Sequence, residues 1–323
     1  MNIKIRSEKI SDYSSIAIVN YEAFMGLNTC KQYVSEPVMV DLLRNNLLFD
    51  PELSLVAEVE GRVAGHALFS PFRFIVSGNV QPGVMLAPLA VKPEFQNKGI
   101  GSALVEEGHR IAKEKGFTLS LLCGHDNYYP RFGYKTRMFS LTGIKAYVCF
   151  KDFDGEGISE RAVRECDIDW ITEAWNKGHS SDSLAIFPGK NISDWSSYSK
   201  RSRCSVITKD GKVLGYVRVA DSDIPDVREL LADSENIPDI LAYVAWKKYG
   251  RAEGEIKVAG TAEKFSSIVS ENLTVADDIA AYSAYMIKVL DDNSPVVEYC
   301  DGVEKGIIKP GVISFHPVFD LDD

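Results

Sequence analysis

The chain has 323 residues, of which 45% are hydrophobic and 25% charged, and its 46 acidic residues outnumber its 36 basic ones to give a net charge of −10. This length suits two domains, and the composition is that of a soluble globular protein. The acidic balance, with no basic stripe, argues against nucleic acid as a partner. Because no apolar run approaches the roughly 20 residues of a membrane span, no membrane association is expected.

The N-terminal residues 1–6 lack the apolar core of a signal peptide. The six cysteines are scattered without Cys-x-x-Cys spacing. Reduced thiols in the cytoplasm explain this pattern better than disulfides or a metal site. We therefore expect a cytoplasmic protein that needs no metal.

In the first half, short strands alternate with amphipathic helices. Ser11 and Asp12 can cap a helix that carries Ile16 and Val19 on one face. A second helix is expected from about Ser102 to the C-capping Gly116. Strands are expected at 3–6, 54–59, 63–69, 72–76, 83–91, 118–123 and within 139–150. The strands 54–59 and 63–69 read as a hairpin, because each alternates in polarity and a glycine-bearing turn separates them.

The turn Gln96-Asn97-Lys98-Gly99-Ile100-Gly101 joins an expected strand to an expected helix. The free N–H groups and the dipole of a helix's first turn attract anions, and glycine lets an anion approach the backbone closely. No Gly-Lys-Ser/Thr follows, so the turn is not a P-loop, and Leu104 stands where a third Rossmann glycine is needed. By itself the turn is either a phosphate site or an ordinary connection.

The flanking residues make the turn more specific. Residues 86–104 closely resemble the acyl-CoA-binding core of the GNAT superfamily of N-acetyltransferases, with its signature Gln/Arg-x-x-Gly-x-Gly/Ala after a strand. Residues 124–134 resemble the aromatic segment of that family, Tyr-x-x-x-Gly-Phe. The resemblance spans about residues 3–150. It implies an α/β fold with a central mixed β-sheet flanked by helices.

The resemblance also implies the residues that bind acetyl-CoA as co-substrate. The backbone of Leu89, Ala90 and Val91 is expected to pair with the pantetheine arm. The pyrophosphate is expected at the amides of Gln96, Asn97, Lys98, Gly99, Ile100, Gly101 and Ser102. Lys98 either adds charge there or is a solvated surface residue. Pro88, which cannot donate to a ladder, marks either a bulge or an edge strand. A backbone N–H near Leu89 or Val91 is expected to stabilise the oxyanion.

The proton donor implied by the resemblance is Tyr129, four residues before Gly133. The alternative is that Tyr128 and Tyr129 both only pack.

The general base is the least determined role. Glu22 is the candidate that we place in the site, and His125 and Asp126 are further candidates. We assign no chemistry to His66 and His109. Contacts with the acceptor are expected from residues 24–33 and the loop that follows.

Residues 151–160 read as a linker, after which the pattern restarts. The segment 206–217 echoes the first hairpin, and Gly61 and Gly65 match glycines 150 positions later. A second domain of the same fold is therefore expected over 161–323, after a first over 1–150. The alternative is a chance match of hairpins. The second half lacks Gln-x-x-Gly-x-Gly, and Asp233 and Glu235 would repel a phosphate. We expect this GNAT-like domain to be degenerate and not to bind CoA.

These expectations combine into one function. The first domain would transfer an acetyl group directly from acetyl-CoA to a primary amine of a small molecule or a peptide. The alternative is a non-catalytic acyl-CoA-binding regulatory module. The second half would close the acceptor cleft or form a homodimer.

Overall fold

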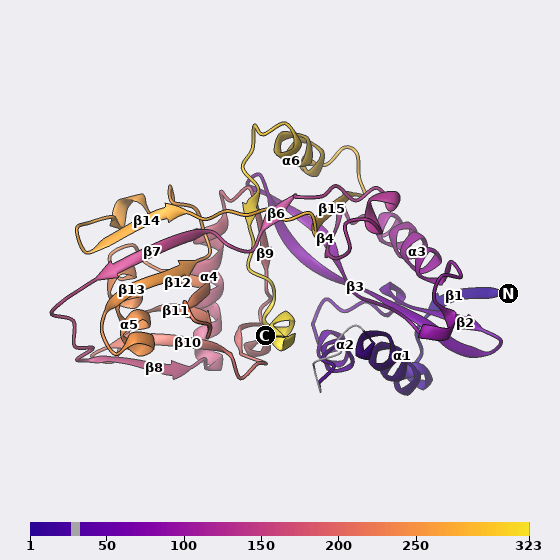
Figure 1. The fold of residues 1–323 in the computed structure, drawn as a ribbon, viewed down its shortest axis with the longest axis horizontal. Helices are drawn as coiled ribbons and strands as arrows, with labels where there is room; N and C mark the ends of the chain where they lie inside the picture. The colour runs from indigo at the N-terminus through magenta and orange to yellow at the C-terminus, as the bar shows by residue number, and fades with distance from the viewer. Residues whose placement is uncertain (27–32, 323) are drawn as a thin grey trace. The chain divides into compact units, whose positions relative to one another are not determined.

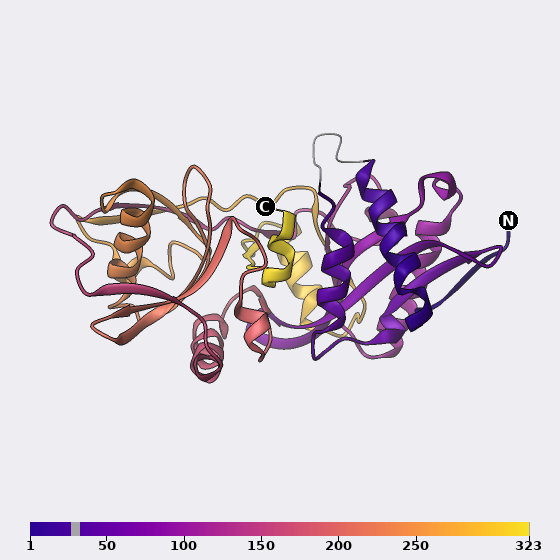
Figure 2. The same cartoon turned by 90° about the horizontal axis from the view of Figure 1, so that it is seen from below.

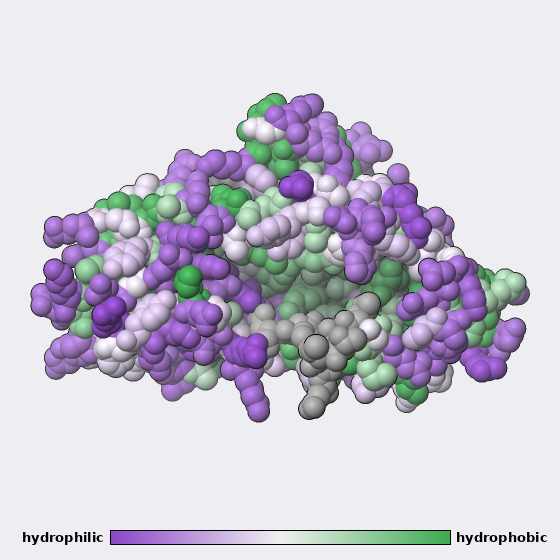
Figure 3. All heavy atoms as spheres, in the orientation of Figure 1, coloured by the Kyte–Doolittle hydropathy of each residue, from purple (hydrophilic) through white to green (hydrophobic). Residues whose placement is uncertain are grey.

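The structure is a computed structural model that describes residues 1–26 and 33–322. These residues form two compact units, each with its own sheet and helices (Figure 1). Unit 1 consists of residues 1–74, 80–138 and 283–307, and unit 2 contains the remainder. Hydrophilic residues cover most of the visible face of both units (Figure 3). Among the described residues, no helix combines the length and the apolar character needed to cross a membrane.

Unit 1 is a mixed sheet with helices on both faces. Its helices are α1 (Tyr13–Met25), α2 (Glu36–Arg44), α3 (Ile100–Glu114) and α6 (Pro295–Glu304). Its strands are β1 (Ile3–Ser7), β2 (Ser54–Val59), β3 (Arg62–Val76), β4 (Asn79–Val91), β5 (Leu119–Cys123) and β15 (Tyr285–Val289). The strands lie in the order β1-β2-β3-β4-β5-β15, and β4 and β5 are parallel. Helices α1 and α2 cover one face of the sheet and α3 covers the other (Figures 1 and 2).

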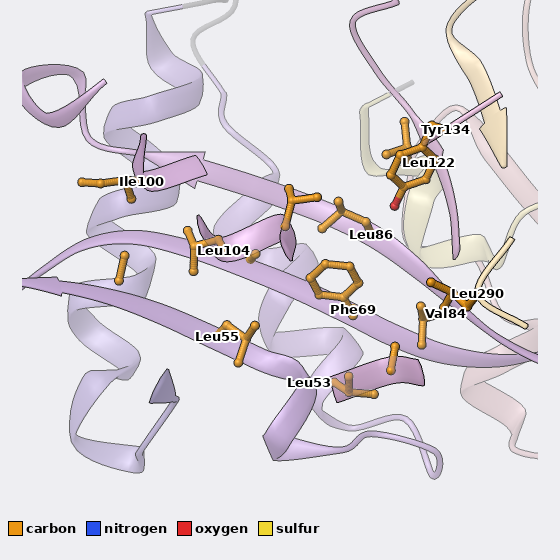
Figure 4. Close-up of a cluster of buried hydrophobic side chains, with 14 of the residues drawn as sticks. Leu53, Leu55, Phe69, Val84, Leu86, Ile100, Leu104, Leu122, Tyr134 and Leu290 are labelled. Atoms are coloured by element: carbon orange, nitrogen blue, oxygen red, sulfur yellow. The ribbon is translucent and has the colours of Figure 1, made fainter. Parts of the chain in front are cut away.

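The core under α3 joins this helix to four strands and to the C-terminal part of the unit (Figure 4). Leu104 on α3 and Phe69 on β3 are fully buried there. Helix and sheet approach closely because Gly108 faces Phe69: an added Cβ would lie 2.0 Å from the ring. Met286 is 0% exposed and Leu290 is 4% exposed in the same cluster, although more than 160 positions separate them from the end of β5 at Cys123.

The C-terminal strand of unit 1 changes the expected domain boundaries. Strand β15 pairs with β5 in antiparallel fashion, from Tyr285↔Cys123 to Val289↔Leu119. Conversely, strand β7 (Ile144–Cys149), which we expected in the first domain, pairs with β13 (Glu253–Val258) of unit 2. The division at 151–160 thus does not coincide with the division into units. The pattern of a strand specifies which of its faces is buried but does not specify which sheet edge it joins.

The remaining elements belong to unit 2. Its helices are α4 (Ile168–His179) and α5 (Ile237–Tyr249). Its further strands are β6 (Phe139–Ser140), β8 (Ile158–Ala162), β9 (Leu184–Phe187), β10 (Ser202–Lys209), β11 (Lys212–Ala220), β12 (Asp226–Ala232), β14 (Leu273–Asp277) and β16 (Gly311–Val312). The main sheet runs β14-β7-β13-β12-β11-β10-β8, and β12 and β13 are parallel.

The two units repeat one architecture, as the hairpin echo predicted. The β2–β3 hairpin has a register shift after Ala57, and the β10–β11 hairpin has one after Ile207. Before the first helix of each unit, an arginine donates to an aspartate at 2.6 Å, Arg6 to Asp12 and Arg161 to Asp167. The register shift and the arginine–aspartate pair thus occur at equivalent positions in both units. A chance match of two hairpins would not reproduce both features.

His66 lies fully buried in unit 1 and links two strands to α1. Ser54 Oγ donates to Glu8 at 2.7 Å, so Ser54 can only accept from His66 Nε2, 3.1 Å away. Asn20 donates to His66 Nδ1 at 3.1 Å. These partners satisfy a neutral imidazole with its proton on Nε2, and burial lowers the pKa of His66 to about 3.

His109 is the second neutral histidine of unit 1. Its Nε2 lies 3.0 Å from the Tyr134 hydroxyl, which lies 2.7 Å from Ser120 Oγ on β5. Burial, with a smaller contribution from the charge of Lys288, lowers the pKa of His109 to about 3.

His179 of unit 2 is in the opposite situation. Its Nδ1 lies 2.7 Å from Asp182 and its Nε2 lies 3.1 Å from Glu229. Burial by itself would lower its pKa, but the two carboxylates outweigh burial, and the pKa of His179 is raised. The protonated ring satisfies both carboxylates, so unit 2 stabilises a buried charge where unit 1 buries neutral rings.

We predict that residues 1–150 alone do not fold into the native sheet of unit 1. The fragment lacks β15, so it exposes the edge of β5 and loses two core side chains, each worth about 1.5–3 kcal/mol. Thermal unfolding followed by circular dichroism should show no cooperative transition. The matched control is residues 1–138 joined by a flexible linker to 283–307, which should unfold cooperatively. A cooperative transition of the 1–150 fragment would contradict the prediction.

The two units should respond to pH with opposite signs. Native His66 and His109 bind fewer protons than in the unfolded chain, so unit 1 loses stability as pH falls below about 6.5, by up to about 1.4 kcal/mol per pH unit for each histidine. His179 binds more protons in the native state, so its contribution to unit 2 is lost as pH rises above about 6.5. Hydrogen exchange of core amides between pH 5 and 8 measures both. His109→Gln should reduce the slope of unit 1 by about half and leave that of unit 2 unchanged, because His66 still contributes. Parallel slopes in both units would refute the assignment.

Candidate active site

Strands β4 and β5 separate halfway along β4. Their parallel pairing runs from Gly83↔Leu119 to Met85↔Leu121 and has no register pair beyond Met85 in the described residues. Strand β4 nevertheless continues to Val91 and passes through the buried Pro88 without a break. The three residues expected to bind pantetheine, 89–91, therefore lie on the part of β4 that has left β5. An extended ligand can pair with such a strand by main-chain hydrogen bonds.

The turn after β4 presents a row of backbone donors. Gly99 has a left-handed φ of 83° and caps α3, which begins at Ile100, two residues earlier than expected. The first backbone donor of the helix is Ala103, whose N–H donates to Gly99 O at 3.0 Å. Among the described residues, no acceptor takes the N–H groups from Asn97 to Ser102. Six such donors at the positive end of a 15-residue helix make this turn a candidate anion site.

Two side chains of the turn fold back onto its own backbone. Lys98 Nζ donates to the Glu94 carbonyl at 2.6 Å and lies 5.3 Å from the centre of the Phe95 ring. Gln96 Nε2 donates to the Val91 carbonyl at 3.0 Å. Both contacts fix the shape of the turn and leave its backbone N–H groups available as donors.

Arg131 is a candidate site residue that the sequence analysis missed. Its Nη2 donates to Ser102 Oγ, in the first turn of α3, at 2.9 Å. Its guanidinium stacks over the Tyr128 ring at 4.1 Å from the centre. The side chain is exposed and adds a full positive charge beside the row of N–H groups. An arginine within an aromatic segment was a visible signal, but only the tertiary structure shows which helix end it reaches.

The turn and the aromatic segment, predicted separately, lie against each other. An added Cβ at Gly101 would lie 2.6 Å from the Tyr128 hydroxyl, so a glycine is required where this tyrosine crosses the start of α3. The row of donors and the tyrosine pair therefore lie next to each other in unit 1.

Tyr129 begins a short 3-10 helix over Tyr129–Phe132 and packs edge-on against two tyrosines. Its ring centre lies 5.0 Å from that of Tyr128 and 5.8 Å from that of Tyr134. Burial raises the pKa of Tyr129 well above its usual value of about 10, with a smaller contribution from Tyr128. Its hydroxyl therefore holds its proton at neutral pH, as a proton donor must.

The candidate base Glu22 lies on α1, and its carboxylate is 3.3 Å from Lys92 Nζ. Lys92 directly follows β4, so Glu22 lies beside the start of the turn. The further candidate Asp126 accepts a hydrogen bond from Ser283 Oγ at 2.5 Å. Of the expected acceptor contacts at 24–33, residues 27–32 lie outside the described residues.

The corresponding turn of unit 2 is built differently. Only residues 233–236 connect β12 to α5, whereas residues 92–99 connect β4 to α3. Asp233 pairs with Lys177 at 2.9 Å, and Pro238 removes one donor from the first turn of α5. Nor do the described parts of the chain contain a cluster of His, Cys, Asp and Glu suited to a metal ion.

The comparisons with known proteins point to one family. Residues 21–134 match the family model described as Acetyltransferase (GNAT) family. Two relatives come from Escherichia coli K12, and both are named Uncharacterized N-acetyltransferase. YjhQ is 35% identical over 127 residues, which are 39% of this chain and 65% of YjhQ, just under two thirds of its length. YhbS is 30% identical over 117 residues, which are 32% of this chain and 69% of YhbS.

A solved structure extends the likeness to the fold of nearly the whole chain. The GCN5-related N-acetyltransferase from Kribbella flavida is 16% identical, with a TM-score of 0.62 over 90% of this chain and 71% of that one. Together with the repeat of sheet order and hairpin irregularities, this likeness confirms the expected mixed α/β architecture of two GNAT-like domains. The match to the family model and to YhbS shows that the chain belongs to the GNAT family of acetyltransferases.

Proposed function

We propose that unit 1 transfers an acetyl group directly from acetyl-CoA to a primary amine of a small molecule or peptide. The observation that carries this proposal is the row of six N–H groups at the start of α3, next to the part of β4 that has separated from β5. The row suits a pyrophosphate, and the separated strand suits the amide-bearing pantetheine arm. The curated relatives, named as N-acetyltransferases, support the same reaction.

The reaction makes one bond and breaks one bond. The amine nitrogen attacks the thioester carbonyl carbon, the carbonyl oxygen becomes an oxyanion, and the carbon–sulfur bond then breaks. A backbone N–H of Leu89 or Val91 would stabilise the oxyanion. Tyr129 would give its proton to the leaving thiolate as the carbon–sulfur bond breaks. Burial raises the pKa of Tyr129 and so disfavours the phenolate, but the same buried surroundings would disfavour a bare thiolate beside it. The amine loses one proton to a base or to water.

Glu22 is the residue that we propose to attract and deprotonate the amine. An alkylammonium, that of Lys92, already lies 3.3 Å from this carboxylate. The position therefore has the charge that a cationic acceptor needs. An acceptor amine would have to compete with Lys92 for the Glu22 carboxylate. If a water molecule carries the proton from the amine to Glu22, the amine need not displace Lys92.

Arg131 extends the site for the phosphates. Stacking on Tyr128 and the hydrogen bond to Ser102 fix one face and one edge of the guanidinium. Its remaining N–H groups can bind a phosphate in a bidentate manner. The equivalent turn of unit 2 is shorter and bears Asp233, so we propose one CoA site per chain.

One observation favours the alternative of a non-catalytic acyl-CoA-binding module. Glu22 on α1 is ion-paired with Lys92 of the same chain, so its carboxylate is already occupied by an ammonium group. Such a module would bind acetyl-CoA as tightly as an enzyme but would release no thiol with any amine.

Isothermal titration with acetyl-CoA should give one site per chain. Arg131→Gln should weaken binding about tenfold, because it removes a charge-assisted hydrogen bond to phosphate. Arg137→Gln, at an exposed arginine six residues further on, is the matched control and should bind as wild type does. Two sites per chain would refute our interpretation of unit 2, and no binding at all would refute the proposed function.

Tyr129→Phe should lower turnover at least about tenfold and leave the affinity for acetyl-CoA within about twofold. The substitution removes only the hydroxyl, so the ring still packs against Tyr128 and Tyr134. Thiol release over a panel of amines measures turnover, and Tyr128→Phe serves as the comparison. Wild-type turnover in the Tyr129 variant would remove this residue from the mechanism.

A further inference from the structure

The aromatic segment of unit 1 passes from one edge of β15 to the other. Cys123, at the end of β5, pairs with Tyr285 on one edge of this strand. Lys135, twelve residues later, forms a bridge with Ile287 on the opposite edge. The residues between them, 124–134, therefore arch over β15, and they include both tyrosines and Arg131. The arch has its supports on a strand that comes from the C-terminal end of the chain.

Hydrogen bonds anchor both ends of the arch to the C-terminal segment. At the first end, Gly124 N–H donates to the Ala284 carbonyl at 3.0 Å, and Ser283 donates to Asp126 at 2.5 Å. At the second end, the Lys135 N–H donates to the Ile287 carbonyl at 2.8 Å, and the Lys135 carbonyl accepts from the Ile287 N–H at 3.1 Å. These anchors fix the ends but do not reach the short 3-10 helix at residues 129–132.

Lys288 reaches the middle of the arch. Alternate residues of a strand share a face, so Lys288 points the same way as Met286 and Leu290, which are buried in the core under α3. Its ammonium emerges from that apolar row and donates to the Phe132 carbonyl at 2.6 Å. A lysine at the carboxyl end of a helical turn satisfies a carbonyl that the turn itself leaves open.

Gly133, which follows Phe132, lies beside the Lys288 ammonium. Gly133 has a left-handed φ of 87° and ends the 3-10 helix. An added Cβ would lie 2.8 Å from Lys288 Nζ. The backbone conformation favours glycine at this position, and a side chain there would displace the Lys288 ammonium.

We propose that Lys288 is a positioning residue for Tyr129 and that residues 283–289 are part of the active site of unit 1. Lys288 holds the carboxyl end of the 3-10 helix whose first residue is Tyr129, and it thereby sets the position of the phenolic hydroxyl. The C-terminal segment completes the catalytic unit. This inference rests on the proposed function for the role of Tyr129, whereas the holding of the arch stands without it.

The test compares three variants of the full-length chain. Lys288→Met keeps the aliphatic stem and removes the donor, and Lys288→Arg restores a donor. Lys135→Met is the control: Lys135 pairs with Asp301 and Glu304 on α6, both at 2.8 Å, so its loss loosens the same C-terminal segment without touching the 3-10 helix. Amide hydrogen exchange of residues 128–133, the Kd for CoA and kcat are measured for each.

In Lys288→Met, these amides should exchange at least about tenfold faster and kcat should fall at least about tenfold, while the Kd for CoA stays within about twofold. Lys288→Arg should recover most of both losses, and Lys135→Met should behave as wild type does. Wild-type exchange and kcat in a folded Lys288→Met protein would overturn the proposal. If wild type itself neither binds CoA nor turns over, the proposed function fails, and the exchange data still decide whether Lys288 holds the arch.

Discussion

The antiparallel pairing of β5 with β15 is the contact on which the rest of unit 1 depends. It closes the free edge of β5, brings Met286 and Leu290 into the core under α3, and supports both ends of the segment that carries Tyr129. On its other edge, β5 pairs with β4 only as far as Met85. Strand β5 is thus paired with β15 along its whole length on one edge, whereas on the other edge β4 diverges from it beyond Met85. The separated side is where a ligand strand fits.

Glycine decides how closely the parts of the site approach. Gly108 lets α3 lie on Phe69, and Gly101 lets Tyr128 cross the start of the same helix. Gly99 takes a left-handed conformation at the start of α3, where six successive N–H groups have no internal acceptor among the described residues. The anion site is therefore a property of the backbone. The side chains of the turn, Lys98 and Gln96, stabilise its shape.

The two units show how one scaffold supports different electrostatics. Both units have the register shift in the hairpin and the arginine–aspartate pair before the first helix, which are parts of the shared backbone architecture. They differ in what they bury. Unit 1 encloses His66 and His109 as neutral rings, while unit 2 encloses His179 between two carboxylates. The turn before α5 is shorter than the one before α3 and carries the acidic Asp233, so the two units share an architecture but differ at this turn.

The sequence by itself determined the strand–turn–helix around Gly99, the aromatic segment around Tyr129 and the repeat of the hairpin. Each of these depends on local spacing, on glycine conformation or on periodicity, which are properties of neighbouring residues. Only the tertiary structure decided that β15 belongs to unit 1 and β7 to unit 2, that Arg131 reaches the start of α3, and that Lys288 holds the arch. The physical reason is that these contacts join residues distant in the chain. The choice of a sheet edge or a carbonyl partner depends on which groups are left unpaired once the whole chain has folded.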